Sequence, residues 1–202
     1  MKKLASLLGI CLLSTSCFAQ ATTTAPALKP VALQAGTATI SPANSRIDFV
    51  GKHEGEKPDP RKGGFGKFTG QAKVATDGSL QSIAWEIETG SLFTEIPKLT
   101  GHLKNSDFFD VREYPKASFQ STSVAAGSGE GNYIVTGDLT LLKATKSIKI
   151  PVSVDVSAEG LTLHSKFEID RTQFGMNYGQ GKVTNAVQLT VAIGQPTEAA
   201  GR

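Results

Sequence analysis

The chain has 202 residues, with 21 basic side chains against 18 acidic ones, and 39% of its residues are hydrophobic. This length predicts one domain whose apolar core is large enough for it to fold without covalent cross-links. The charge is nearly balanced and no basic stripe is present, which argues against nucleic acid as a partner.

Residues 1–21 have the features of a secretory signal peptide. Lys2 and Lys3 precede an apolar run from Leu4 to Leu13, and Ala19-Gln20-Ala21 offers a small-x-small cleavage site. The apolar run is too short to span a bilayer, and no transmembrane segment is expected in the mature chain. We therefore expect an exported protein. Cleavage would remove two lysines and leave 19 basic against 18 acidic side chains, which lowers the formal charge from +3 to +1.

Both cysteines, Cys11 and Cys17, lie inside this segment. The mature chain is therefore expected to lack disulfides, although its compartment would permit them. Cys17 leaves an alternative open, because small residues before a cysteine also occur in lipoprotein signals. In that case the protein would be anchored to a membrane through Cys17.

The remaining chain divides by composition into a leader, a domain and a tail. Residues 22–36 contain mainly Ala, Thr and Pro without an aromatic residue, and this predicts a flexible leader. The domain is expected over residues 37–195, followed by a C-terminal tail over residues 196–202.

Within the domain, apolar and polar residues alternate with a period of two, as expected for half-buried strands. Eight strands are predicted, around residues 46–52, 65–74, 83–89, 117–122, 133–141, 148–156, 161–169 and 187–193. The polar stretch 53–62 contains two prolines and is expected to form an exposed loop. Asp77-Gly78 is typical of a hairpin turn. The pattern predicts an all-β domain.

One segment, Leu99 to Val111, has the character of a short helical insert. Ser106 or Asp107 could cap a turn that carries Phe108 and Phe109. Tyr114-Pro115 then prevents further helix, because the proline ring crowds the residue before it. We expect this insert to lie across one mouth of a barrel.

Half-buried antiparallel strands joined by short turns predict either a sandwich or an up-and-down barrel. Small residues are interleaved with large ones on the apolar faces, namely Gly51, Gly70, Ala72, Ser121 and Gly137. Small inward residues would leave space for a cavity, whereas bulges and a filled core are the alternative.

The sequence contains no recognisable catalytic or metal-binding motif. His53, His102 and His164 lack metal-ligand spacing, and no phosphate loop or G-x-S-x-G elbow is present, so neither a metal nor a cofactor is expected. Asp170 and Arg171 are interpreted as a structural ion pair. Lys143, Lys146 and Lys149 lie around one turn, where they would form a solvated cluster or receive an anionic head group.

Three blocks carry a family resemblance: HLKNSDFFDVREYPKASFQST at 102–122, GDLTLLKATKSIKI at 137–150 and IDRTQFGMN at 169–177. Together, in this order, they resemble the YceI-like family of exported bacterial proteins. The resemblance runs from about residue 38 to 193. It departs from the family pattern at residues 41–45, in the polar stretch 53–62, and at Lys143 and Ser147.

The resemblance implies a lipocalin-like, eight-stranded antiparallel barrel that binds a polyisoprenoid or a similar lipid chain. It also implies a periplasmic location and no known catalytic residues. The expected ligand-binding residues are the large apolar residues of the inward strand faces together with the insert: Phe49, Trp85, Phe108, Phe109, Phe119, Leu139 and Phe167. The expected function is non-enzymatic binding of a polyisoprenoid, an isoprenoid quinone or another long-chain lipid. A lipid-modifying enzyme and a filled barrel that acts as an interaction module remain the alternatives, and a homodimer is left open.

Overall fold

The computed structural model describes residues 28–55 and 59–194. The expected signal peptide, the tail over residues 196–202 and most of the expected leader lie outside these residues. The described chain contains eleven strands, one α-helix and two 3-10 helices. In chain order they are β1 Thr37–Ile40, β2 Ser45–Lys52, β3 Pro60–Phe65, β4 Phe68–Val74, β5 Leu80–Glu88, η1 Thr89–Ser91, β6 Leu92–Thr94, α1 Pro97–Leu103, β7 Lys116–Ala126, β8 Asn132–Leu141, β9 Ala144–Ser157, β10 Gly160–Asp170, η2 Arg171–Phe174 and β11 Ala186–Ile193.

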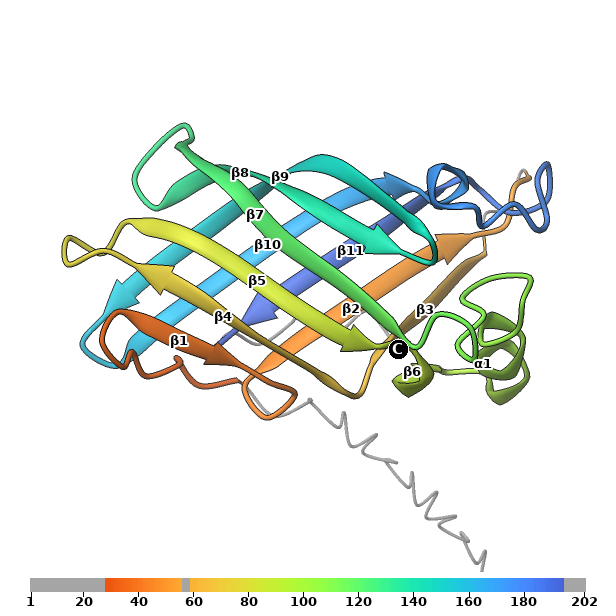
Figure 1. Cartoon of the computed structure of the whole chain (residues 1–202), viewed down its shortest axis with the longest axis horizontal. Helices are drawn as coiled ribbons and strands as arrows, with labels where there is room; N and C mark the ends of the chain where they lie inside the picture. The colour runs from red at the N-terminus through yellow and green to blue at the C-terminus, as the bar shows by residue number, and fades with distance from the viewer. Residues whose placement is uncertain (1–27, 56–58, 195–202) are drawn as a thin grey trace, which may run out of the picture.

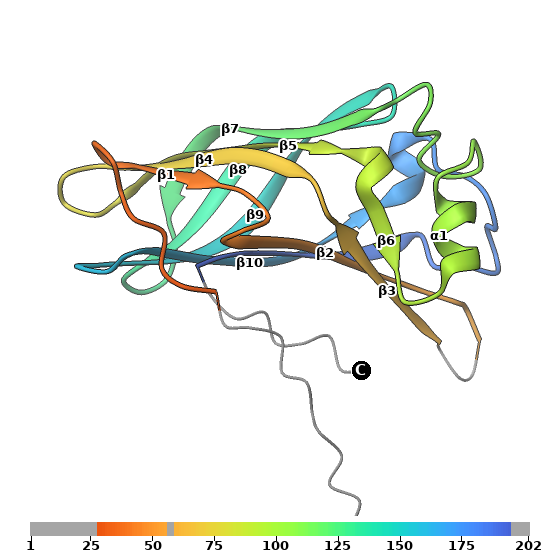
Figure 2. The same cartoon turned by 90° about the horizontal axis from the view of Figure 1, so that it is seen from below.

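All eleven strands form one antiparallel sheet in the order β1-β4-β5-β7-β8-β9-β10-β11-β2-β3-β6. The sheet curls around a common interior, and α1 lies at one end of it (Figures 1 and 2). The predicted all-β class and the lipocalin-like antiparallel architecture are therefore confirmed. The predicted count of eight strands is wrong, because β1, β3 and β6 are additional.

The corner between β3 and β4 explains why β3 was missed. Phe65 and Phe68 are both buried although they are three residues apart, which breaks the alternation of a single strand. The chain turns at Gly66-Lys67, so that β3 pairs with β2 and β6 while β4 pairs with β1 and β5. Pro60 to Lys62, expected in an exposed loop, begin β3. The corner is fixed where the Gly66 and Lys67 amides donate to the Ser91 carbonyl and hydroxyl oxygens, at 3.1 and 3.0 Å.

The helical insert begins earlier than predicted. Pro97 opens α1, a position where the absent N–H of proline has no cost, and the helix ends at Leu103. Phe108 and Phe109 follow it in a series of turns, with their amides bonded to the carbonyls of Asn105 and Leu103, each at 3.0 Å. The predicted cap at Ser106 or Asp107 is therefore wrong, and the turns carry the rings. No helix of the described residues is long and apolar enough to cross a bilayer.

At the end of the sheet opposite α1, the interior is filled by aliphatic side chains. Seven of them are between 0 and 1% exposed: Ile40, Ile83, Val135, Ile150, Leu161, Leu163 and Ile193. They come from β1, β5, β8, β9, β10 and β11, so inward faces far apart in the sequence meet in one core. We call this region the packed half.

Both ends of the described chain lie against the packed half. Val31 and Leu161 exchange two backbone hydrogen bonds, at 2.9 and 2.8 Å, so residues 28–36, which the composition assigned to a flexible leader, are held on the barrel. At the other terminus, the Gly194 amide donates to the Asn44 carbonyl at 2.8 Å. A Cβ on Gly194 would lie 3.0 Å from Pro30 Cα, so the two termini are neighbours.

Candidate functional site

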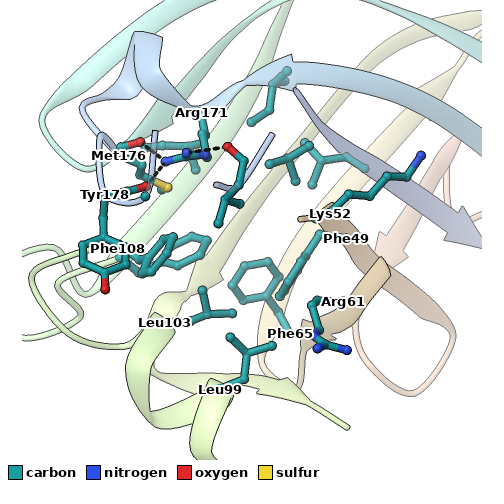
Figure 3. Close-up of a pocket in the computed structure, with 18 of the residues that line it drawn as sticks. Phe49, Lys52, Arg61, Phe65, Leu99, Leu103, Phe108, Arg171, Met176 and Tyr178 are labelled. Atoms are coloured by element: carbon teal, nitrogen blue, oxygen red, sulfur yellow. Dashed lines mark hydrogen bonds between the residues drawn. The ribbon is translucent and has the colours of Figure 1, made fainter. Parts of the chain in front are cut away.

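The other half of the curled sheet encloses a cavity of roughly 650 Å³, which lies below α1. Its volume is within the range of ligand sites in proteins. The deep walls are apolar, with Ile47 and Phe49 from β2, Leu139 from β8, and Leu189 and Val191 from β11. Figure 3 shows the aromatic and aliphatic side chains that converge on this space. We call this region the hollow half.

Six of the seven residues expected to bind the ligand line the cavity: Phe49, Trp85, Phe108, Phe109, Leu139 and Phe167. Phe119 is not among the lining residues. It is 1% exposed and lies behind Trp85, where the two rings stack with centroids 4.5 Å apart and planes 21° apart. The structure thus places Phe119 in the packed core, with Trp85 between it and the cavity.

Two glycines make room for this stacked pair. A Cβ on Gly70 would lie 3.0 Å from Trp85 Cβ and 2.3 Å from the Ala84 carbonyl oxygen, and a Cβ on Gly137 would lie 2.4 Å from Phe119 Cζ. The Phe119 ring therefore fills the space beside Gly137, and the backbone of residues 84 and 85 closes the space beside Gly70, so the alternative of a filled core holds at both positions. Gly51 differs, because a Cβ built there meets no atom within 4 Å.

Apolar side chains of the insert cover the mouth of the cavity. Leu99 and Leu103 project from α1, and Phe109 packs edge-on against Phe65 of β3 with centroids 5.8 Å apart. Phe65 in turn contacts Phe49 of β2 at the same centroid distance. A continuous apolar surface therefore runs from the insert into the deep wall.

His102 joins the insert to the loop that follows η2. Its ring packs edge-on against Phe108 and Tyr178, with centroids 5.2 and 5.0 Å away. Its Nε2 lies 3.0 Å from Asp107 Oδ2, so the imidazole is oriented by a carboxylate of the same insert. Since Tyr178 belongs to the loop over residues 175–184, which we call the mouth loop, these contacts connect two sides of the mouth.

Arg171 holds the mouth loop in place. The side chain is only 3% exposed, and its guanidinium donates to the carbonyls of Met176, Tyr178, Val183 and Thr184, three of which are drawn in Figure 3. Burial lowers the pKa of this guanidinium, and the negative charges of Asp170 and Glu54 oppose this shift.

The predicted ion pair between Asp170 and Arg171 is absent from the ion pairs of the described residues. Asp170 instead caps η2, with Oδ1 accepting from the Thr172 amide at 2.9 Å and from the Thr172 hydroxyl at 2.6 Å. These hydrogen bonds stabilise the carboxylate and lower the pKa of Asp170. Adjacent residues of opposite charge suggested a pair, but each side chain satisfies a different part of the backbone.

The basic residues at the cavity are not those that the sequence singled out. Lys143, Lys146 and Lys149 are exposed, and none of them lines the cavity. The lining instead includes Lys52, Arg61 and Lys182, which are scattered through the sequence and meet only in the fold. Among residues 28–55 and 59–194, no group of three His, Cys, Asp or Glu side chains could hold a metal ion.

A single curled antiparallel sheet with an apolar cavity under a helical cover defines a lipocalin-like barrel. Residues 39–194 match the YceI-like domain, and the chain belongs to the YceI-like family. The crystal structure of Burkholderia cenocepacia BcnA is similar, with a TM-score of 0.66 and 25% identity over 74% of this chain and 94% of that one. A polyisoprenoid binding domain from Saccharophagus degradans, implicated in plant cell wall breakdown, gives a TM-score of 0.62 at 15% identity over 78% of this chain and 96% of that one.

Curated relatives carry the family designation UPF0312. One from Pseudomonas savastanoi pv. phaseolicola is 48% identical over 65 residues, which is 32% of this chain and 33% of that protein. Another from Pseudomonas putida strain W619 is 28% identical over 117 residues, or 55% of this chain and 60% of that protein. The chain thus spans about a third of the length of the first and 60% of the second.

Proposed function

We propose that this protein is an exported, non-enzymatic binding protein that holds a long apolar ligand in the hollow half of its barrel. The observation that carries the proposal is the cavity of roughly 650 Å³ with apolar deep walls. An apolar chain in such a space is stabilised by about 25 cal/mol for each Å² removed from water, so binding needs few polar contacts.

The ligand class that fits is a polyisoprenoid, an isoprenoid quinone or a related long-chain lipid. The polyisoprenoid binding domain from Saccharophagus degradans shares the fold, which supports an isoprenoid chain as the first candidate. Export to the periplasm is part of the proposal and rests on the signal-like residues 1–21.

The chemistry of the lining favours binding over catalysis. No Ser, Thr, Cys, Asp or Glu is among the described residues that line the cavity, so they offer no carboxylate base and no hydroxyl or thiol nucleophile of Ser, Thr or Cys. His102 is oriented by Asp107, but both lie in the insert and their contact helps to hold the mouth closed.

Two measurements test the proposal. Mass spectrometry of an organic extract from protein purified from its native host should detect a long-chain lipid in stoichiometric amount. Trp85 is the only tryptophan in the chain and lies at the cavity wall, so its emission should shift or quench saturably when an isoprenoid quinone is titrated into delipidated protein. A flat titration on protein shown to be empty would contradict the proposal.

A blocking variant and a matched control make the test specific. Gly51→Leu places a large side chain in open space at the cavity wall, and we expect it to weaken binding strongly while the fold persists. Gly90→Leu is the control, because Gly90 also has no atom within 4 Å of its Cβ position but does not line the cavity. Equal loss of binding in both variants would argue against the cavity as the site.

A further inference from the structure

The charged side chains that line the cavity are all cationic, namely Lys52, Arg61, Arg171 and Lys182. The other ionisable residues of the lining are His53, His102 and Tyr178. The whole chain has 21 basic and 18 acidic residues, yet no carboxylate lines the cavity in the described part of the chain. The apolar walls account for binding of the ligand's chain, and this excess of basic residues bears on the polar end of the ligand.

Most of these cations gather on one side of the mouth. The Thr184 amide donates to the Lys52 carbonyl and the Glu54 amide to the Lys182 carbonyl, each at 2.9 Å, so the end of β2 and the mouth loop run side by side. Arg61 stands opposite Gly51 in the β2–β3 register. Because Gly51 has no side chain, a ligand group can approach the backbone beside Arg61.

The countercharges nearby are few. Arg61 pairs with Asp59, and both side chains remain substantially exposed. Asp170 and, to a smaller extent, Glu54 are close enough to Arg171 to oppose the fall in its pKa. Lys52 and Lys182 form no ion pair with any described residue. Lys52 and Lys182 therefore remain available to an anion at the rim, and Arg61 can contact the same anion in exchange for Asp59, which it binds through both Nη1 and Nη2.

We propose that the ligand of this cavity is a prenyl chain that ends in a phosphate ester, with the chain in the hollow half and the phosphate among Lys52, Arg61 and Lys182. The inference rests on the proposed lipid-binding function and specifies the head group. A phosphate monoester carries a charge of about −1.5 to −2 at neutral pH and three acceptor oxygens, which suits three cations from separate segments. A quinone or alcohol head would leave Lys52 and Lys182 without a partner of opposite charge among the described residues.

The experiment compares geranylgeranyl monophosphate with geranylgeraniol, titrated into the delipidated mature protein and followed by Trp85 emission. At low salt we expect the phosphate to bind about tenfold tighter or more. The advantage should shrink as salt is raised, because the rim is exposed to solvent and its charges are screened. The affinity for the alcohol should change little.

Two double variants test whether the preference for the phosphate over the alcohol comes from the lysines at the rim. The double variant Lys52→Ala/Lys182→Ala should lose most of the advantage of the phosphate while it binds the alcohol as before. Lys73→Ala/Lys166→Ala is the matched control, since both lysines are exposed strand residues that do not line the cavity, and it should keep the preference.

The outcomes separate this inference from the proposed function. Equal affinities for the phosphate and the alcohol would overturn the head-group inference and leave lipid binding intact. Equal loss of the preference in the rim and control variants would also overturn it, because net charge alone would then explain the effect. If neither prenyl compound nor a quinone bound to empty protein, the proposed function itself would fail.

Discussion

The packed half and the hollow half of the barrel are built from the same strands but differ in what fills them. β5, β8 and β10 run through both, with Ile83, Val135 and Leu163 in the packed half and aromatic or larger aliphatic residues further along. In the packed half, branched side chains interlock and leave almost no exposed area. In the hollow half, rings line a space that they do not fill.

The stacked pair of Trp85 and Phe119 marks the boundary between the two halves. One ring borders the cavity and the other lies in the core, although both belong to the inward faces of neighbouring strands. The comparison shows that inward orientation does not decide whether a residue can meet a ligand. Trp85, Phe119 and Leu139 are cross-strand partners at one level of the barrel, so contact with a ligand depends on which side chain covers which, and here the Trp85 ring covers Phe119.

The largest expected effect tests this boundary. Phe119→Ala should lower the free energy of unfolding by about 3–5 kcal/mol, as for other buried aromatic residues, because a void opens in the packed half. Phe167→Ala, at a half-buried residue of the cavity wall, should cost much less stability but weaken lipid binding. Urea unfolding and Trp85 titration measure the two effects. Equal stability losses would contradict the division into two halves.

The next effect concerns the mouth loop of the hollow half. Arg171→Met keeps bulk but removes the donors to four carbonyls, all of them in the mouth loop itself. A buried acceptor without a donor costs ~1–3 kcal/mol, and the loop can open toward water, so we expect a loss of about 2–3 kcal/mol. Amide hydrogen exchange should accelerate in the mouth loop and stay unchanged around Leu161. Uniform acceleration throughout the barrel would show that Arg171 supports the whole fold.

A pair of glycine substitutions gives a smaller contrast. In Gly137→Ala the new methyl group would lie 2.4 Å from Phe119 Cζ and 2.7 Å from the Gln120 carbonyl oxygen, and we expect this overpacking to cost about 1–2 kcal/mol. Gly51→Ala meets open space and should leave the midpoint of thermal unfolding nearly unchanged. A similar loss in both variants would mean that strand propensity, and not packing, determines the effect.

The smallest expected effect is a pH dependence of the free energy of unfolding, which arises from Asp48 in β2, a strand of the hollow half. Burial raises the pKa of Asp48 above its usual 3.8, and Arg46 opposes this shift only in part. A raised pKa means that the folded state favours the protonated carboxyl, so the contribution of Asp48 to stability is present at low pH and is lost as pH rises through the folded pKa. Asp48→Asn should therefore gain slightly in stability over the natural protein between pH 3 and pH 7. Asp155→Asn, on an exposed strand residue, should show no such trend.

Much of the fold could be predicted, because alternation along β8, β9 and β10 reports directly which face is buried. The three additional strands could not be predicted, for a physical reason. β6 has three residues and β1 four, too few for a clear period, and β3 and β4 share one apolar run that bends at Gly66. Short edge strands depend on their partners more than on their own sequence.

The candidate site was predictable in its aromatic residues and not in its polar ones. Phe49 and Phe167 stand in clear strand patterns, so their inward direction follows from the sequence. The role of Arg171 depends on carbonyls up to 13 residues away, in a glycine-rich loop without periodicity. Lys52, Arg61 and Lys182 come together through the pairing of β2 with β3 and with the mouth loop, which no local pattern encodes.

The neighbouring positions of Pro30 and Gly194 have a consequence for how the molecule can be attached to something else. Both ends of the domain leave from the packed half, on the side away from the mouth loop and α1 (Figure 2). A tether, a fused domain or a surface linkage at either terminus would thus hold the barrel by its solid end. The mouth would then face away from the point of attachment.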